Sequence, residues 1–91
     1  MGRHRVVLAP SVDRALPRIP QHIRRKLAGW VAAVEAQGLE EIRRLRGYHD
    51  EPLAGARAGQ RSIRLSRSYR AIYRVQADAV IRIEEVTKHA Y

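Results

Sequence analysis

The chain has 91 residues and a hydrophobic fraction of 45%, which allow one domain, residues 1–91, with a single modest core. Its 18 Lys and Arg against 9 Asp and Glu give a formal net charge of +9, which indicates a polyanion or an acidic protein as partner. Because there is no cysteine, a disulfide scaffold, a thiolate metal site and a cysteine nucleophile are all excluded.

The N-terminal residues predict a strand and a short helix. Residues 5–9, Arg-Val-Val-Leu-Ala, form an apolar run that stops at Pro10 and predicts a strand. This run is too short for a signal peptide and no later run reaches transmembrane length, so we expect a cytoplasmic protein without a membrane partner. Ser11 is expected to cap a short helix that continues to Leu16.

The longest predicted helix covers residues 20–37. Its apolar residues recur at the spacing of one helix face, and they are Ile23, Leu27, Trp30, Val31 and Val34. Pro20 suits the first turn, and Gly38 is placed to end the helix as a left-handed cap. Residues 39–48 allow a further short helical turn, and residues 49–60 are typical of a loop.

The C-terminal third predicts three more strands, at residues 60–65, 69–75 and 80–86. In the first of them, apolar side chains alternate with polar and basic ones, so one face is apolar and the other basic. The last strand divides into two sets, with Ile81 and Ile83 on one face and Val80, Arg82, Glu84 and Val86 on the other. The order β-α-α-β-β-β predicts an α+β fold, with two N-terminal helices on a small, mainly antiparallel sheet.

Arginine supplies nearly all of the positive charge, since Lys26 and Lys88 are the only lysines. Residues 57–74 hold six arginines and no acidic residue. Arginine suits bidentate phosphate contacts, although a codon bias or the protection of strand edges would also enrich it. The candidates for RNA or phosphate binding are Arg61, Arg64, Arg67, Arg74 and Lys88.

Motifs of metalloproteases, NTPases, dinucleotide enzymes and serine hydrolases are absent from the sequence, and we expect no metal and no cofactor. Only the adjacent acids Asp50 and Glu51 suggest a metal site. Cleavage of RNA without a metal needs a base for the 2′-hydroxyl, an acid for the leaving 5′-oxygen and cations that stabilise the phosphorane. The candidates near the predicted end of the sheet are Glu51, Arg64, Arg70, Lys88, His89 and Tyr91. Each also has an ordinary structural reading, as a turn, surface or terminal residue.

Five segments carry a resemblance in their order and spacing. They are Leu45-Arg-Gly47, Glu51-Pro-Leu-x-Gly55, Ser62-Ile-Arg-Leu65, Tyr69-Arg-Ala-Ile-Tyr73 and Glu85-Val-x-Lys-His-x-Tyr91. Together they resemble the RelE/ParE superfamily of toxins from bacterial type II toxin–antitoxin systems, above all the RelE, YoeB and HigB mRNA interferases. The resemblance implies a metal-independent endoribonuclease that cuts mRNA, typically at the ribosome. It also implies a hetero-oligomer with a small acidic antitoxin, an extended or helical segment of which covers the basic sheet.

The same resemblance implies the roles of single residues. Arg70 matches the arginine that stabilises the scissile phosphate, and Arg64 matches a position often held by a phosphate-contacting lysine. Glu51 matches the glutamate of a Glu-Pro-Leu loop, where it would act as the general base or orient one. His89 would be the general acid, and Tyr91 would stack on or orient the base beside the cut.

The sequence departs from the family pattern at two places. Ala90 separates His89 from Tyr91, whereas YoeB-like proteins end in adjacent histidine and tyrosine. Ser62 stands where RelE has a lysine, which favours a mechanism centred on the histidine, with Lys88 assisting.

Two other functions remain open at this point. One is a ParE-like toxin that inhibits DNA gyrase and cuts nothing, which the presence of the C-terminal histidine and tyrosine disfavours. The other is a catalytically silent nucleic-acid binder that serves only as the ligand of an antitoxin or as a co-repressor.

Overall fold

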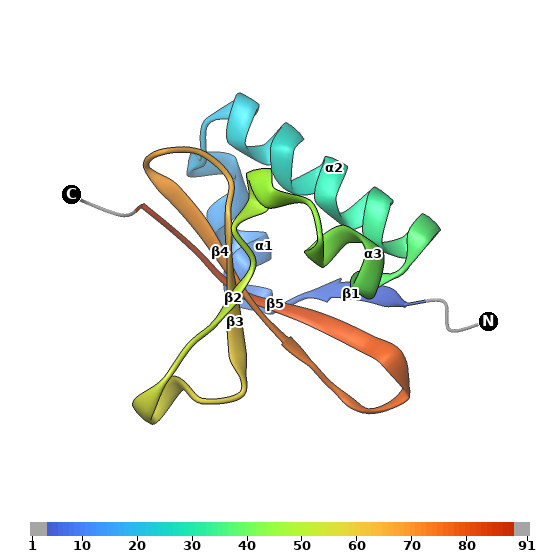
Figure 1. Ribbon diagram of the computed structural model, residues 1–91. Helices are drawn as coiled ribbons and strands as arrows, with labels where there is room; N and C mark the ends of the chain where they lie inside the picture. The colour runs from blue at the N-terminus through green and yellow to red at the C-terminus, as the bar shows by residue number, and fades with distance from the viewer. Residues whose placement is uncertain (1–3, 89–91) are drawn as a thin grey trace.

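The computed structural model describes residues 4–88, and within them five strands form one mixed sheet (Figure 1). The strands are β1 (Arg5–Leu8), β2 (Glu51–Pro52), β3 (Gln60–Arg64), β4 (Tyr69–Val75) and β5 (Val80–Lys88), in the order β1-β5-β4-β3-β2. β1 runs parallel to β5, and all other neighbours are antiparallel. The predicted α+β class and the mainly antiparallel sheet are therefore confirmed. The short strand β2 lies within the segment that the sequence predicted as a loop.

The helices follow β1 in the chain. They are α1 (Pro10–Ala15), α2 (Gln21–Gln37) and α3 (Leu39–Arg43). Figure 1 shows α2 and α3 on one side of the sheet. α1 lies beside β5 where β1 ends, and there the backbone N–H of Ala9 donates to the carbonyl of Ile83 at 2.9 Å. Among residues 4–88, no helix is both long enough and apolar enough to cross a membrane.

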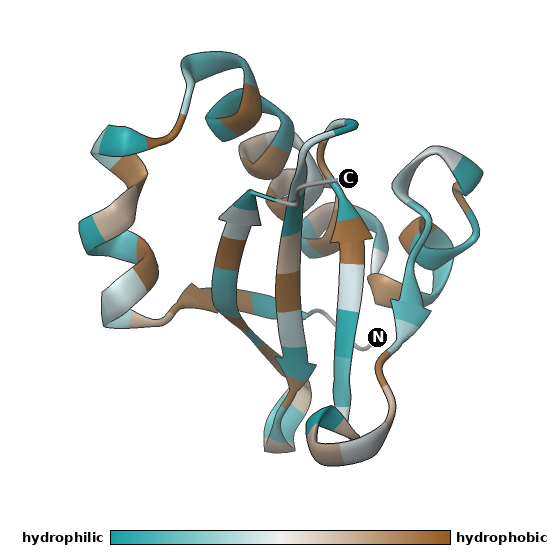
Figure 2. Ribbon diagram, turned by 90° about the vertical axis from the view of Figure 1, so that its left-hand side faces the viewer, coloured by the Kyte–Doolittle hydropathy of each residue, from teal (hydrophilic) through white to brown (hydrophobic). Residues whose placement is uncertain are grey.

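The core lies between α2 and the face of the sheet that α2 covers. The predicted stripe of α2 is buried at Ile23, Leu27, Trp30 and Val34. Trp30 lies against Tyr73 of β4, with ring centroids 5.1 Å apart and planes inclined by 44°. Figure 2 shows hydrophobic and hydrophilic residues alternating along the strands, as expected of a sheet with one covered face. The opposite face of the sheet is not covered by α2 and α3.

The helix ends correct two details of the prediction. α1 begins at Pro10 with Ala9 as its N-cap, so Ser11 is not the cap. Proline suits this first position because the N–H that it lacks would have no partner within the helix. Pro20 is the N-cap of α2 instead of a residue of its first turn, and Gly38 ends α2 with φ of 90° and ψ of 151°. The positive φ was predicted, but the extended ψ is that of a linker into α3 and not of a left-handed cap.

A β-bulge in β5 changes which side chains face the helices. The register between β4 and β5 shifts at this point, because Tyr73 pairs with Ile83 whereas Ile72 pairs with Glu85. Glu84 is therefore the extra residue of the bulge. The prediction that Val86 shares a face with Arg82 is therefore wrong. Val86 packs against the core, because the bulge reverses the alternation after Glu84. Both carboxylates then lie on the face away from the helices.

Candidate functional site

The uncovered face of the sheet carries four of the predicted site residues, Glu51, Arg64, Arg70 and Arg74, in rows that cross the strands. The strand register gives an upper row of Arg64, Arg70 and Thr87, a middle row of Glu51, Ser62, Ile72 and Glu85, and a lower row of Gln60, Arg74 and Arg82. The middle row therefore has a carboxylate at each end and lies between two pairs of arginines.

A hollow of about 350 Å³ lies over the middle row. It is lined by Glu51, Leu53, Arg57, Ser62, Arg70, Ile72, Glu85 and Thr87. Ser62 and Ile72 are buried and form its base, whereas Glu51 is exposed at its rim. The hollow thus combines a partly apolar base with charged sides of both signs, which suits a group that has a flat apolar part and an anionic part.

Arg70 is held in this hollow by two neighbours. Its Nη1 donates to Oγ of Ser62 at 2.9 Å and lies 3.9 Å from Oε1 of Glu51. The Arg70 side chain is 17% exposed, and that of Glu51 is 62% exposed. A guanidinium has five N–H donors in a planar fork that matches a phosphate. The structure therefore brings together Glu51 and Arg70, the two predicted catalytic residues among those it describes.

The other two predicted catalytic residues, His89 and Tyr91, lie outside the described residues. The last described residue, Lys88, ends β5 and pairs with Tyr69, the first residue of β4. The Lys88 side chain is exposed. In the chain, His89 directly follows the strand that carries Glu85 and Thr87 to the hollow.

Arg61 does not belong to the uncovered face, which corrects its selection as a phosphate-binding candidate. Its Nε donates to Oδ1 of Asp50 at 2.6 Å, and the other Asp50 oxygen accepts from the Tyr73 hydroxyl at 2.6 Å. Burial opposes the charge of Arg61, but the hydrogen bond and charge of Asp50 outweigh it and raise the pKa of Arg61. Burial and the bond to Asp50 also raise the pKa of Tyr73. Asp50 is thus engaged with Arg61 and Tyr73, and Glu51 with Arg70, so the two acids do not act as a pair.

The remaining predicted cations differ in their exposure and in whether they form an ion pair. Arg64 lies directly opposite Arg70 in the upper row and is half-buried. Arg67 is exposed in the turn between β3 and β4. Arg74 forms an ion pair with Glu84, with Nε 3.4 Å from Oε1. Arg64 therefore lies where it can assist Arg70, whereas the charge of Arg74 is balanced within the protein.

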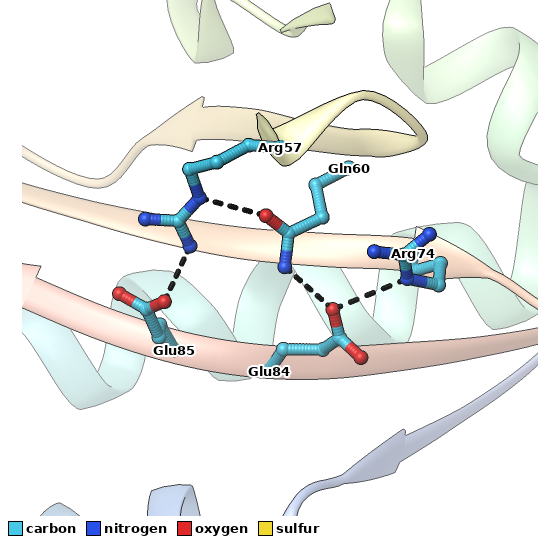
Figure 3. A network of polar contacts seen from close by, with 5 residues as sticks. All are labelled: Arg57, Gln60, Arg74, Glu84 and Glu85. Carbon is cyan, nitrogen blue, oxygen red and sulfur yellow. Dashed lines mark hydrogen bonds and ion pairs between the residues drawn. The ribbon is translucent and has the colours of Figure 1, made fainter. Parts of the chain in front are cut away.

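A polar network runs along the lower side of the hollow (Figure 3). Nε2 of Gln60 donates to Oε1 of Glu84 at 2.7 Å, and Nε of Arg57 donates to Oε1 of Gln60 at 2.7 Å. Nη2 of Arg57 also forms an ion pair with Glu85. Arg57 and Glu85 line the hollow, but neither was among the residues that the sequence predicted for the site. A signal for Glu85 was present, because the change of apolar spacing from two residues to three before Val86 indicates a bulge.

The first testable consequence concerns the pH dependence of stability. The hydrogen bond from Gln60 lowers the pKa of Glu84, and Arg74 adds to this effect, although burial opposes it. A lowered folded-state pKa stabilises the fold above the ordinary carboxyl pKa of about 4.3, and this contribution is lost as the pH falls through the lowered value. Glu84→Gln should therefore weaken the pH dependence of the urea midpoint below about pH 5. Glu40→Gln, at a side chain that is 80% exposed, is the control. Identical pH profiles for wild type and Glu84→Gln would contradict this prediction.

Solved structures share this fold, although no protein-family model and no curated protein sequence matches the chain. The archaeal RelE–RelB complex from Pyrococcus horikoshii OT3 is similar with a TM-score of 0.74 and 25% identity, over 97% of each chain. The RelBE2 toxin–antitoxin complex from Mycobacterium tuberculosis has a TM-score of 0.62 and 26% identity, over 96% of this chain and 99% of the other. YafQ from E. coli has a TM-score of 0.70 and 18% identity, over 93% and 92%. The chain thus has the RelE-like fold, and the resemblance drawn from its motifs is confirmed.

Proposed function

We propose that this chain, with its RelE-like fold and motifs, is the toxin of a type II toxin–antitoxin system that cleaves mRNA at the ribosome without a metal. The observation that supports this most strongly is the placement of Arg70. It lies in a hollow on the uncovered face, bonded to Ser62 and 3.9 Å from the Glu51 carboxylate. Arg70 and Glu51 would supply two of the three groups that metal-free RNA cleavage needs, the cation that stabilises the phosphate charge and the base.

The proposed reaction assigns one task to each group. Glu51 removes the proton from the 2′-hydroxyl, or orients the group that does, and the 2′-oxygen attacks the adjacent phosphorus. Arg70, assisted by Arg64, stabilises the negative charge that builds on the phosphate oxygens. His89 protonates the departing 5′-oxygen, which leaves a 2′,3′-cyclic phosphate on one product. Tyr91 stacks on or orients the base beside the cut.

The proposed partner is a small acidic antitoxin that covers the basic face of the sheet. The net charge of +9 favours an acidic partner, and arginines on the uncovered face would pair with its carboxylates. Several of the similar structures are of toxin–antitoxin complexes, including RelE–RelB and DinJ–YafQ. A short acidic protein encoded by the adjacent gene should therefore co-purify with the tagged chain, and its absence from the purified material would count against this partner.

The proposed activity is tested by tightly controlled induction of the chain and of His89→Ala in a bacterial culture, with primer extension on a reporter message. We expect growth arrest and new message ends with the wild type and neither with His89→Ala, because the leaving oxygen then lacks its acid. Growth arrest with intact messages and loss of DNA supercoiling would indicate gyrase as the target instead. Unaltered growth would indicate a silent binder.

A further inference from the structure

One arginine of the segment between β2 and β3, Arg57, reaches across the sheet and contacts β5. Arg57 ends a short 3₁₀ turn, Gly55–Arg57, and forms an ion pair with Glu85 through Nη2. Its Nε donates to Oε1 of Gln60 at 2.7 Å, so the guanidinium is fixed by two strands (Figure 3). The two charged side chains are 45% and 40% exposed. The pair is therefore oriented but remains accessible from solvent.

Both members of this pair line the hollow that holds Arg70 and Glu51. Glu85 occupies the end of the middle row opposite to Glu51, and the bulge at Glu84 turns it to the uncovered face. An anion that reaches Arg70 from above the sheet therefore also approaches Arg57. In the free protein, the carboxylate of Glu85 already occupies the anion-binding side of Arg57.

The chemistry of the pair favours an exchange of partners. An ion pair with both side chains about half exposed contributes little to stability, because solvent screens it. A phosphate offers the arginine fork a bidentate partner, whereas it is repelled by a nearby carboxylate. The neighbouring pair of Arg74 and Glu84 differs, because Glu84 is only 24% exposed and also accepts from Gln60. Glu84 is therefore held in place, and Glu85 is the carboxylate that can leave its arginine.

We propose that Arg57 is a phosphate-binding residue of this hollow and that Glu85 is a competing carboxylate, which a phosphodiester displaces when it binds. The inference rests on the proposed function, since it places a second phosphate of the same RNA strand beside the one at Arg70. Glu85 thereby lowers the affinity of the free protein for polyanions.

Binding is measured by the fluorescence anisotropy of a labelled single-stranded DNA 12-mer, which lacks the 2′-hydroxyl and cannot be cleaved by the proposed reaction. Arg57→Ala is expected to weaken binding about tenfold, because a charged hydrogen-bonded contact is lost. It should also lower the slope of log affinity against log salt by about 0.7, the value for one contact to a single strand. Glu85→Gln is expected to strengthen binding by about threefold, a smaller effect because the exposed carboxylate is screened.

Two exposed helix positions supply controls with the same change of charge. Arg25→Ala on α2 and Glu40→Gln on α3 should each change the affinity by less than about twofold, because charges far from the hollow are screened. A merely structural pair would weaken binding in both variants. Opposite signs for Arg57→Ala and Glu85→Gln therefore support the inference. An Arg57→Ala affinity equal to that of Arg25→Ala, or weaker binding by Glu85→Gln, would overturn it.

Two further measurements keep the result interpretable. Circular dichroism shows whether each variant is folded, and Arg57→Gln replaces Arg57→Ala if the latter is not, because glutamine retains a donor for Gln60. Cleavage of mRNA with ribosomes is measured on the same wild-type preparation. Binding of the 12-mer without cleavage of mRNA would contradict the proposed function and leave this inference standing. Failure of the wild type to bind the 12-mer would overturn the inference.

Discussion

Replacing Arg70 with alanine is expected to lower the single-turnover rate of mRNA cleavage by about 10²- to 10³-fold, the loss typical of removing one group that stabilises transition-state charge. Arg70 is fixed before substrate binds, by the bond to Ser62 at 2.9 Å and by Glu51 at 3.9 Å. Its charge therefore needs little reorganisation when the phosphorane forms. The rate is measured with excess toxin and programmed ribosomes, so that binding does not limit it.

The matched variant is Arg70→Lys, which keeps the positive charge but loses the planar fork. We expect the cleavage rate of Arg70→Lys to lie between the rates of wild type and Arg70→Ala, because one ammonium cannot reach both Ser62 and a phosphate oxygen with the same geometry. The fold should persist in both variants, since Arg70 lies on the uncovered face and outside the core cluster. A folded Arg70→Ala that cleaves within about threefold of wild type would remove Arg70 from the proposed mechanism.

The order of strands and helices could be predicted because each element carries a clear period. The stripe from Ile23 to Val34 repeats at helical spacing and is buried against the sheet. In β3, the alternation around Ile63 gave the correct covered face. These patterns are local consequences of burying one side of an element, so they can be read without knowing the tertiary partners.

The details that shape the site depend on contacts between distant segments. β2 is a two-residue strand that exists through its pairing with β3, and no period can reveal so short an element. The bulge in β5 depends on the register against β4, although the change of apolar spacing before Val86 is a local sign of it. Arg57 reaches the hollow from a loop, and loop residues carry no periodic signal. For these reasons the prediction selected Arg70 and Glu51, which line the hollow, but not Arg57 and Glu85, which line it as well.

Arg61 shows how strand parity separates residues of the same type. It shares the covered face with Ile63 and Leu65, and there it bonds to Asp50. The predicted alternation already gave this placement, because residues two apart in a strand share a face. Composition alone groups Arg61 with the other arginines of residues 57–74, whereas its position in the strand separates it from them. Where a strand has a covered face, parity is the stronger criterion for choosing binding residues.

The largest expected loss of stability follows from Trp30→Ala. The Trp30 side chain is fully buried on α2 and lies against Tyr73, which joins the helix layer to the central strand β4. Truncation of a buried tryptophan costs about 3–5 kcal/mol in the free energy of unfolding, of a total of about 5–15 kcal/mol for a small domain. Urea unfolding must be followed by far-UV circular dichroism, because Trp30 is the only tryptophan and its fluorescence is lost in the variant.

Trp30→Phe keeps an aromatic ring at this position and removes the indole N–H. The buried indole Nε1 has no hydrogen-bond partner among the described residues, so phenylalanine removes volume without leaving a broken bond. We therefore expect Trp30→Phe to cost about 1–2 kcal/mol, less than the cost of alanine, because it keeps an aromatic ring against Tyr73. Arg25→Ala, exposed on the same helix, should change stability by less than about 0.5 kcal/mol. Equal losses for phenylalanine and alanine would contradict this prediction, because an aromatic ring against Tyr73 would then contribute nothing to stability.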